Sequence, residues 1–363
     1  MIWQGSKYSS RFIGKLFFKN QRTDEDVWAS YGAQDCNDIL AKKFSHPLAT
    51  ETELEFPIAY GILVHKGAPL LEQLLQAIYM PHNAYCLHID VKASETFKRT
   101  VESMTRCLGN VVITKNSVDV LWAHISILQA QLNCVADLLQ SPVKWKYFVS
   151  LVGQDFPLYD NNGIVNGLKT LQGKNNIDSY PMPEGNKDRT LFVFHFEKTS
   201  SGQFSYGDVI KTQTSIRKEP PPHSLKIYKG SNHVALTRRF AEFILFDQKA
   251  KDFYNWLNDT FIPDETFYAT LQQVPGVPGG HQGKQTWIMR SMKWWSDQTC
   301  WGYILRDICW MDVADLRWAL SKEESKRLFV QKIPFDYNEN MLKCLRIAAK
   351  GRNYGQGLFP KNP

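Results

Sequence analysis

The chain lacks the long apolar runs that membrane-spanning helices need. A helix crosses the hydrocarbon core with about 20 mostly apolar residues, whereas the longest apolar candidate here is IAYGILV at residues 58–64. The first twenty residues, MIWQGSKYSSRFIGKLFFKN, contain basic and aromatic side chains but no continuous apolar stretch. They therefore do not have the pattern of a signal peptide.

The common nucleotide-binding and zinc-binding motifs are also missing. Neither G-x-G-x-x-G nor G-x-x-x-x-G-K-[ST] occurs, which argues against a dinucleotide-binding fold and against a P-loop. The seven cysteines form no C-x-x-C pair and have no His at zinc-finger spacing. A structural zinc site is therefore not indicated. Internal repeats and low-complexity segments are absent as well.

The charge is moderate and scattered. The formal net charge is +7, and the Lys and Arg do not run together. Nucleic acid is therefore not a favoured partner, whereas a nucleotide diphosphate needs only one or two cations. A hydrophobic content of 43% excludes general disorder, and 363 residues can bury a substantial core. Eleven Trp and fifteen Tyr suit a carbohydrate or nucleotide site, although most of them should belong to the core.

The cysteines alone leave the cellular compartment open. Cys300 and Cys309 could close a ten-residue loop, and the chain-entropy model gives such a bond about 2–3 kcal/mol of stabilisation. Disulfides would indicate a secretory compartment. Seven buried thiols in a cytosolic enzyme are the alternative.

Apolar patterning predicts alternating strands and helices from residue 56 onward. Four continuous apolar runs are typical of strands buried on both faces: 56–65, 84–90, 110–114 and 145–158. Helical spacing occurs between them at 69–80 and at about 121–139. This alternation predicts an α/β fold with a Rossmann-like, mostly parallel sheet flanked by helices.

Ligands bind beyond the carboxyl ends of the strands in such sheets. That rule points to three segments: Val64-His65, His88-Ile89-Asp90 and Gly153-Gln154-Asp155. Residues 1–50 are polar and weakly patterned, and we expect a stem or an irregular wrap there. Residues 175–225 should be a long insertion or loop, and 225–246 should form a strand, a turn, a second strand and a helix.

Two adjacent acids stand in an apolar frame in FIPDETF, residues 261–267. The local interpretation is a helix start, since Pro favours the first turn and acids are stabilised there. The functional interpretation is a carboxylate held partly out of water, with a raised pKa, that takes a proton from a hydroxyl. The rest of the chain has to decide between them.

Several uncommon strings, in one order from about Asp35 to about Cys344, resemble the core 2 β-1,6-N-acetylglucosaminyltransferases of glycosyltransferase family 14, which branch mucin-type O-glycans. The strings are FPIAYGILVHK, AIYMPHNAYCLHIDVK, LNCVADLL, WKYFVSLVGQDFPL, DTFIPDETFYATLQQVPGVPG and DICWMDVADLRW. The resemblance implies a GT-A-type fold with acceptor-side insertions. It also implies a stem-like segment at 1–50, a catalytic domain at 51–350 and a C-terminal tail at 351–363.

The implied activity is inverting transfer of GlcNAc, or a related hexose, from a UDP-sugar to the 6-hydroxyl of GalNAc in Gal-GalNAc cores. Glu265 matches the family's catalytic base, and we expect Asp264 to help cap the helix start. The strand that usually ends in Asp-x-Asp ends here in Asp90-Val91-Lys92. No cofactor and no divalent metal are therefore expected.

The resemblance also implies the binding residues. The donor residues are Asp90, Trp122, Leu63, Arg306 and Lys332, of which the last two would stabilise the departing UDP. The acceptor residues are Asp178, Arg189 and Trp294. Trp122 stands where the family has Tyr, and Asp178 stands where it has Glu. The donor site therefore looks preserved, whereas the identity of the acceptor is left open.

The implied disulfides are Cys36–Cys107, Cys86–Cys134 and Cys300–Cys309. Cys344 matches a cysteine whose partner lies in the family's stem. The resemblance implies a type II Golgi membrane protein with its catalytic domain in the lumen. We expect the true start to lie upstream of Met1, so that membrane contact would run only through an anchor missing from this chain.

The implied partners are a UDP-sugar and an O-glycan or glycoprotein acceptor. Two other hypotheses are weighed against the branching transferase. A peptide O-xylosyltransferase-like enzyme of the same superfamily would use UDP-xylose on a serine. A non-catalytic glycan-binding relative would have lost Glu265 or the two cations, yet all three positions are filled.

Overall fold

The computed structural model describes residues 22–32, 34–198, 209–281, 286–296 and 299–359. Its centre is a five-stranded sheet with the order β10-β4-β1-β2-β3, in which β10 alone is antiparallel to its neighbour. The strands are β1 (Ile58–Val64), β2 (Ala84–Ile89), β3 (Val111–Ile113), β4 (Tyr147–Val152) and β10 (Ala235–Thr237). The predicted α/β fold with a mostly parallel sheet is confirmed.

The two faces of the sheet carry side chains of different size, because neighbouring residues of a strand point to opposite faces. On one face, the rings of Tyr60 and Tyr85 stack with their centroids 5.3 Å apart. On the other face, a Cβ at Gly61 would lie 2.6 Å from the Phe148 ring. The small residues of that face let helix α7 (Ser126–Gln140) pack closely on β1 and β2.

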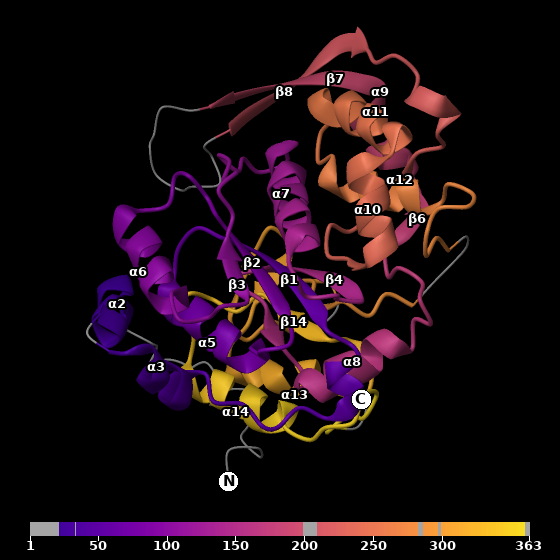
Figure 1. Ribbon diagram of the computed structural model, residues 1–363. Helices are drawn as coiled ribbons and strands as arrows, with labels where there is room; N and C mark the ends of the chain where they lie inside the picture. Colours follow the sequence, from indigo (N-terminus) through magenta and orange to yellow (C-terminus); the bar gives the residue numbers. More distant parts are fainter. Residues whose placement is uncertain (1–21, 33, 199–208, 282–285, 297–298, 360–363) are drawn as a thin grey trace.

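Helices cover both faces (Figure 1). The face of Tyr60 packs against residues of α5 (Ala68–Ile78), α6 (Glu95–Thr105), α8 (Asn161–Lys169), α13 (Leu316–Ala319) and α14 (Glu339–Ala349). The opposite face packs against α7, α10 (Arg238–Phe246), α11 (Gln248–Trp256) and α12 (Asp264–Gln272). Within the described ranges, no helix is both long enough and apolar enough to cross a membrane.

The N-terminal part of the chain is more regular than its sequence indicates. Residues that we expected to wrap irregularly form α2 (Asp24–Gly32) and α3 (Cys36–Lys43), and α4 (Glu51–Leu54) follows. Buried Glu72 of α5 holds this part, because it accepts hydrogen bonds from Tyr31 at 2.9 Å and from Lys43 at 3.0 Å. The division into segments 1–50, 51–350 and 351–363 stays a prediction, and residues 1–21 and 360–363 lie outside the described residues.

Two expected segments differ in the structure. The strand expected at 145–158 is two strands, β4 and β5 (Phe156–Pro157). A turn separates them, in which the Asp155 carboxylate accepts the Val152 N–H at 2.7 Å. The helix expected from about residue 121 begins only at Ser126, because the preceding residues form a turn with Ala123 at φ 65°.

The region 175–225 is not simply a loop. It contains β6 (Ser179–Pro181), α9 (Asp188–Leu191) and an antiparallel hairpin of β7 (Phe192–Lys198) and β8 (Val209–Arg217). In Figure 1 this hairpin forms the upper end of the molecule, opposite α13 and α14. Most of its described side chains are at least partly exposed on both faces, so the apolar alternation that marks a strand is weak there.

The segment 225–246 forms a strand, a turn, a second strand and a helix, as predicted. The first strand is β9 (Tyr228–Gly230), which pairs with β6, and β10 and α10 follow. A three-stranded sheet contains β11 (Arg290–Met292), β14 (Phe329–Gln331) and β5, and a short hairpin contains β12 (Tyr303–Leu305) and β13 (Ile308–Trp310). The 3₁₀ turns are η1 (Glu184–Asn186), η2 (Pro222–Ser224), η3 (Leu257–Asp259), η4 (Val313–Asp315) and η5 (Glu324–Lys326).

All seven cysteines lie in the described part of the chain. Six form the disulfides Cys36–Cys107, Cys86–Cys134 and Cys300–Cys309, which are the pairs that the resemblance implies. Cys344 is an exposed free cysteine on α14. The second bond joins β2 to α7, and the third joins the hairpin β12–β13 to the segment before it.

A buried ion pair connects the two largest sheets. The Arg290 guanidinium of β11 donates to both oxygens of Asp155, at 2.9 and 2.8 Å, and neither side chain is exposed. Arg290 also donates to the Ser150 carbonyl of β4. The two residues therefore hold the turn after β4 against β11.

Arg290→Met is expected to lower the free energy of unfolding by about 3–5 kcal/mol, because it leaves the Asp155 charge buried without its partner. Chemical denaturation measures this loss. The double variant Asp155→Leu/Arg290→Met should recover much of it, since no charge then remains. Lys98→Met, which breaks the exposed Glu95–Lys98 pair, is the control and should cost less than about 1 kcal/mol. A loss of that small size for Arg290→Met would contradict the prediction.

Candidate active site

A cavity of about 600 Å³ opens beyond the carboxyl ends of the central strands. Residues from the ends of β1, β2 and β4 line it, including Leu63, Asp90 and Gln154. Because β2 and β4 lie on opposite sides of β1, this is where the order of strands reverses, the usual ligand site of open α/β sheets. The volume lies within the range of roughly 300–1,000 Å³ that is typical of small-molecule sites.

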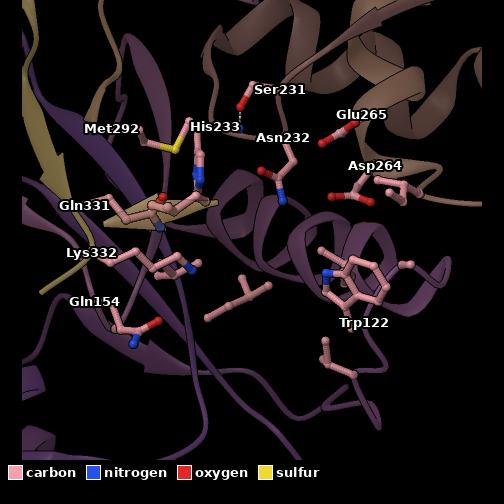
Figure 2. Close-up of a pocket in the computed structure, with 18 of the residues that line it drawn as sticks. Trp122, Gln154, Ser231, Asn232, His233, Asp264, Glu265, Met292, Gln331 and Lys332 are labelled. Carbon is pink, nitrogen blue, oxygen red and sulfur yellow. Dashed lines mark hydrogen bonds between the residues drawn. The ribbon is translucent and has the colours of Figure 1, made fainter. Parts of the chain in front are cut away.

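The residues that the sequence singles out converge on this cavity. Seven of them line it: Leu63, Asp90, Trp122, Asp178, Glu265, Trp294 and Lys332. The other two touch lining residues, since Arg189 binds Glu265 and Arg306 lies over the Trp122 ring. Figure 2 shows Gln154 and Lys332 across the cavity from Asp264 and Glu265. The individual roles expected for these side chains stay predictions.

Asp90 is fixed at the end of β2 by three contacts. Its Oδ1 accepts the Lys92 N–H at 2.8 Å, and its Oδ2 accepts the Val120 N–H at 3.2 Å and faces Lys92 Nζ at 3.3 Å. Lys92 also binds Asp119 and donates to the Val120 carbonyl at 2.9 Å. A lysine ammonium therefore occupies the place beside Asp90 where a divalent cation would need a further oxygen ligand.

The histidines of the cavity wall are kept neutral by burial. Burial lowers the pKa of His65 to about 4, with a further contribution from Lys66. Burial also lowers the pKa of His88 and, well below the ordinary value, that of His233. The His88 Nε2 accepts the Val118 N–H at 2.9 Å, which suits the neutral ring. At neutral pH these rings therefore add no positive charge to the cavity.

Several buried polar atoms of the cavity wall have no hydrogen-bond partner within the described ranges. They are His88 Nδ1, Gln154 Nε2, His233 Nδ1 and Asp264 Oδ1. Buried polar atoms in folded proteins almost always have partners, so each such atom needs an explanation. A polar ligand or water in the cavity would supply the missing partners. The wall therefore favours a ligand rich in hydrogen-bonding groups.

Trp122 reaches the cavity because α7 starts late. The turn before the helix places its indole 41% exposed in the cavity wall. The Ile262 N–H donates to the Ala123 carbonyl at 2.9 Å, so the turn is tied to the segment that enters α12. The Trp122 and Phe261 rings meet edge to face with centroids 5.9 Å apart. No local signal in the sequence separates this turn from the helix that follows.

Glu265 lies in the first turn of α12 between two cations. Its Oε2 accepts from Arg189 Nη1 at 2.8 Å and faces Lys229 Nζ at 3.1 Å. Lys229 also donates to the Tyr180 hydroxyl at 3.0 Å. Burial opposes the charge of Lys229, but Glu265 and Tyr180 outweigh it and raise the lysine pKa. The Glu265 carboxylate is therefore held in one orientation at the cavity.

The expectation that Asp264 caps the helix is wrong. Pro263 is the N-cap residue of α12, and no side chain caps this end. Asp264 instead turns inward and is 5% exposed in the cavity wall. Burial, and secondly the neighbouring Glu265, raise its pKa to about 7. The raised pKa that the apolar frame of FIPDETF suggested is thus found at Asp264.

Arg306 and Lys332 form a cationic side of the site. Arg306 starts the two-residue turn between β12 and β13, where it and Asp307 have φ of 53° and 62°. Such turns normally carry Asn-Gly, so Arg306 accepts backbone strain in this position. Its guanidinium lies 4.0 Å from the centre of the Trp122 ring. Burial lowers the pKa of Lys332 more than the Asp155 charge raises it, and the charge of Arg306 lowers it further. An anion beside both cations would be stabilised.

Sequence analysis missed Lys229. It reaches Glu265 only because β9 pairs with β6 and packs on α12. The stretch of chain between Lys229 and Glu265 contains no pattern that announces this contact. Only the tertiary structure brings the two residues together.

Comparison with known proteins identifies the chain's family. Residues 58–319 match the Core-2/I-Branching enzyme family. An N-acetyllactosaminide beta-1,6-N-acetylglucosaminyl-transferase of Mus musculus is 40% identical over 323 residues, covering 87% of this chain and 78% of the relative. A beta-1,3-galactosyl-O-glycosyl-glycoprotein beta-1,6-N-acetylglucosaminyltransferase 4, also of Mus musculus, is 37% identical over 335 residues, covering 89% and 71%. The human N-acetyllactosaminide enzyme is 37% identical over 352 residues, covering 95% and 84%.

The mostly parallel α/β sheet, the polar cavity beyond its strand ends and these relatives together define a glycosyltransferase. The chain belongs to the Core-2/I-Branching enzyme family.

Gly230→Ala is expected to deform the cavity wall, because the added Cβ would lie 1.7 Å from the Asp178 carbonyl oxygen. The strand β9 must then move away from β6 and carry Lys229 with it. Overpacking of this kind costs about 1–3 kcal/mol of unfolding free energy, measurable by denaturation, and transferase activity should fall. Gly185→Ala is the control, since a Cβ there meets nothing within 4 Å. Equal stability and activity of the two variants would refute the prediction.

Proposed function

We propose that the protein is an inverting β-1,6-N-acetylglucosaminyltransferase that uses a UDP-sugar and acts on the 6-hydroxyl of GalNAc in Gal-GalNAc cores. The observation that carries this proposal is the placement of Glu265, held by Arg189 and Lys229, on one cavity in a member of this family. The same cavity is also lined by Lys332, a cation from a distant part of the chain.

Glu265 is the proposed base. The acceptor oxygen attacks the anomeric carbon of the donor sugar from the face opposite the diphosphate, and its proton passes to the Glu265 carboxylate. The bond between the anomeric carbon and the diphosphate oxygen breaks, and its electron pair leaves with UDP. Arg189 and Lys229 keep the carboxylate oriented for this proton transfer, so that less reorganisation is needed during the reaction.

Arg306 and Lys332 are the proposed partners of the diphosphate. Negative charge grows on the departing UDP, and fixed cations stabilise it in a buried site. The proposal requires no divalent metal at this step. This part of the proposal is supported by the surroundings of Asp90. The Lys92 ammonium lies there, where a divalent cation would need a second oxygen ligand. Asp90, Leu63 and Trp122 would hold the uridine part.

The acceptor is proposed to lie beside Asp178, Arg189 and Trp294. Two relatives are named N-acetyllactosaminide beta-1,6-N-acetylglucosaminyl-transferase, one of them 40% identical, and they support a second candidate acceptor, an N-acetyllactosamine chain. A non-catalytic binding protein is a weaker alternative, because the base and both cations are present. A peptide O-xylosyltransferase is weaker because these relatives are named as N-acetylglucosaminyltransferases. The three disulfides support an oxidising compartment, and we propose the Golgi lumen.

Glu265→Gln is expected to lower kcat by about 10²–10⁴-fold, because the amide cannot take the acceptor proton. UDP affinity should change little, since the side chain keeps its size. Glu184→Gln, at a side chain that is 86% exposed, should leave kcat unchanged. A Glu265→Gln enzyme within tenfold of wild type would exclude Glu265 as the base.

Arg306→Met and Lys332→Met should each weaken UDP binding, measured by titration calorimetry in excess EDTA. Each removes a charge of the proposed diphosphate site, and a charged hydrogen bond contributes about 1.5–3 kcal/mol. Lys169→Met, at an exposed position of α8, is the control. Wild-type activity should also persist in EDTA, and strict dependence on added manganese would overturn the metal-independent part of the proposal.

The acceptor is tested by a panel with purified protein. UDP-GlcNAc, UDP-glucose and UDP-xylose are each offered with Gal-GalNAc-aryl, N-acetyllactosamine and serine-peptide acceptors. We expect GlcNAc transfer to Gal-GalNAc to give the highest kcat/KM. Preference for N-acetyllactosamine would establish the second candidate, and xylose transfer to the peptide would replace both.

A further inference from the structure

Asp264 and Glu265 are adjacent acids in different surroundings. The Glu265 side chain is 32% exposed and binds two cations. Asp264 is 5% exposed, lines the same cavity, and its Oδ1 lacks a hydrogen-bond partner in the described part of the chain. Figure 2 shows both carboxyl groups on one side of the cavity, with Asp264 between Glu265 and Trp122.

The groups that face Asp264 only partly offset the cost of burying its negative charge. The charged neighbours are Glu265 on its own helix, Arg189 on α9 and Lys229 on β9. Both cations already contact the Glu265 carboxylate. Tyr268, one turn along α12, is buried and stays a neutral phenol, because burial raises its pKa far above the ordinary value. Arg189 and Lys229 therefore compensate one carboxylate of the two, Glu265.

Two carboxyl groups that are close together with limited compensation keep a proton between them, and the surroundings decide which group holds it. Here the more exposed, ion-paired Glu265 is the better site for the charge. The buried Asp264 is the better site for the proton. We propose that Asp264 is a positioning residue that stays protonated while Glu265 is ionised, and that ionisation of Asp264 switches the site off.

The switch follows from the two cations. While Asp264 is neutral, Arg189 and Lys229 have one carboxylate to hold, and they fix Glu265. When Asp264 ionises, a second negative charge attracts the same two cations and adds repulsion inside the cavity. This consequence for turnover rests on the proposed function of Glu265, whereas the protonation of Asp264 does not.

Protonation of Asp264 can be measured through stability, without an assay of activity. A carboxyl group that keeps its proton in the folded protein but loses it in the unfolded chain makes folding less favourable as the pH rises. For Asp264 the pH window runs from its ordinary pKa of 3.8 to its raised pKa of about 7. Below the window the penalty is absent, and above it the penalty is complete. The Asp264→Asn variant has no such equilibrium at this position, since an amide does not titrate.

The experiment compares the unfolding equilibrium of wild type and Asp264→Asn by denaturation from about pH 4 to pH 8. The stability of Asp264→Asn relative to wild type should rise across this range, by at least about tenfold in the equilibrium constant, because one unit of pKa shift corresponds to a factor of ten. Glu55→Gln, an exposed acid, is the control and should run parallel to wild type. A parallel curve for Asp264→Asn would overturn the proposal.

A second arm tests the coupling to Glu265. In a Glu265→Gln background, the pH at which the Asp264→Asn difference develops should move to lower values, because the neighbouring charge is gone. If that pH did not move, the proposal that the Glu265 charge keeps Asp264 protonated would be overturned. This arm remains valid if Glu265 proves not to be the base, so the two failures are distinguishable.

The third arm measures turnover against pH. Wild-type kcat should fall above about pH 7 as Asp264 ionises, and this fall should be missing in Asp264→Asn. KM is measured at each pH as well, so that an effect on acceptor binding is separated from the effect on kcat. A merely structural role would change the level of activity but leave the alkaline fall in place. Persistence of the same alkaline fall in Asp264→Asn would overturn the switch.

Discussion

The site depends on one fully buried ion pair, Asp155–Arg290. Asp155 immediately follows Gln154 of the cavity wall, and Arg290 starts the strand β11 that pairs with β14. Lys332 directly follows β14. A backbone hydrogen bond also joins this region, with the Ile333 N–H donating to the Gln154 carbonyl at 3.0 Å. A bidentate guanidinium–carboxylate contact has a narrow geometry. The Asp155–Arg290 pair therefore fixes the distance and the orientation of two walls of the cavity relative to one another.

The charges around the cavity fall into two groups with different tasks. Arg189 and Lys229 are compensated by Glu265, and the Lys229 pKa is raised accordingly. Arg306 and Lys332 disfavour one another: burial lowers the Lys332 pKa, Asp155 raises it in part, and Arg306 lowers it further. The neutral histidines of the cavity wall add no charge. The two cations beside Glu265 are thus compensated by that carboxylate, and a bound anion would lower the repulsion between Arg306 and Lys332.

The sequence predicted what depends on local patterns. The strands β1 and β2 follow from long apolar runs, and the edge at which the cavity opens follows from the rule for parallel strands. The contact between Lys229 and Glu265 could not be predicted, because it depends on the pairing of β6 with β9. The late start of α7 depends on one positive φ at Ala123, which leaves no signature in the sequence. The role of Asp264 as a cap was a reasonable local inference, but tertiary burial overrides it.

The hairpin β12–β13 has a mechanical consequence. Three residues on each side support a two-residue tip that carries Arg306, and the side chains of Tyr303 and Ile304 are largely exposed. The Cys300–Cys309 disulfide closes the base of this short arm. The arm is also braced at its tip, because the Trp295 N–H donates to the Asp307 carbonyl at 2.9 Å. Reduction would remove the brace at the base and leave the brace at the tip, so the turn that carries Arg306 would stay in place while the base of the hairpin gained freedom.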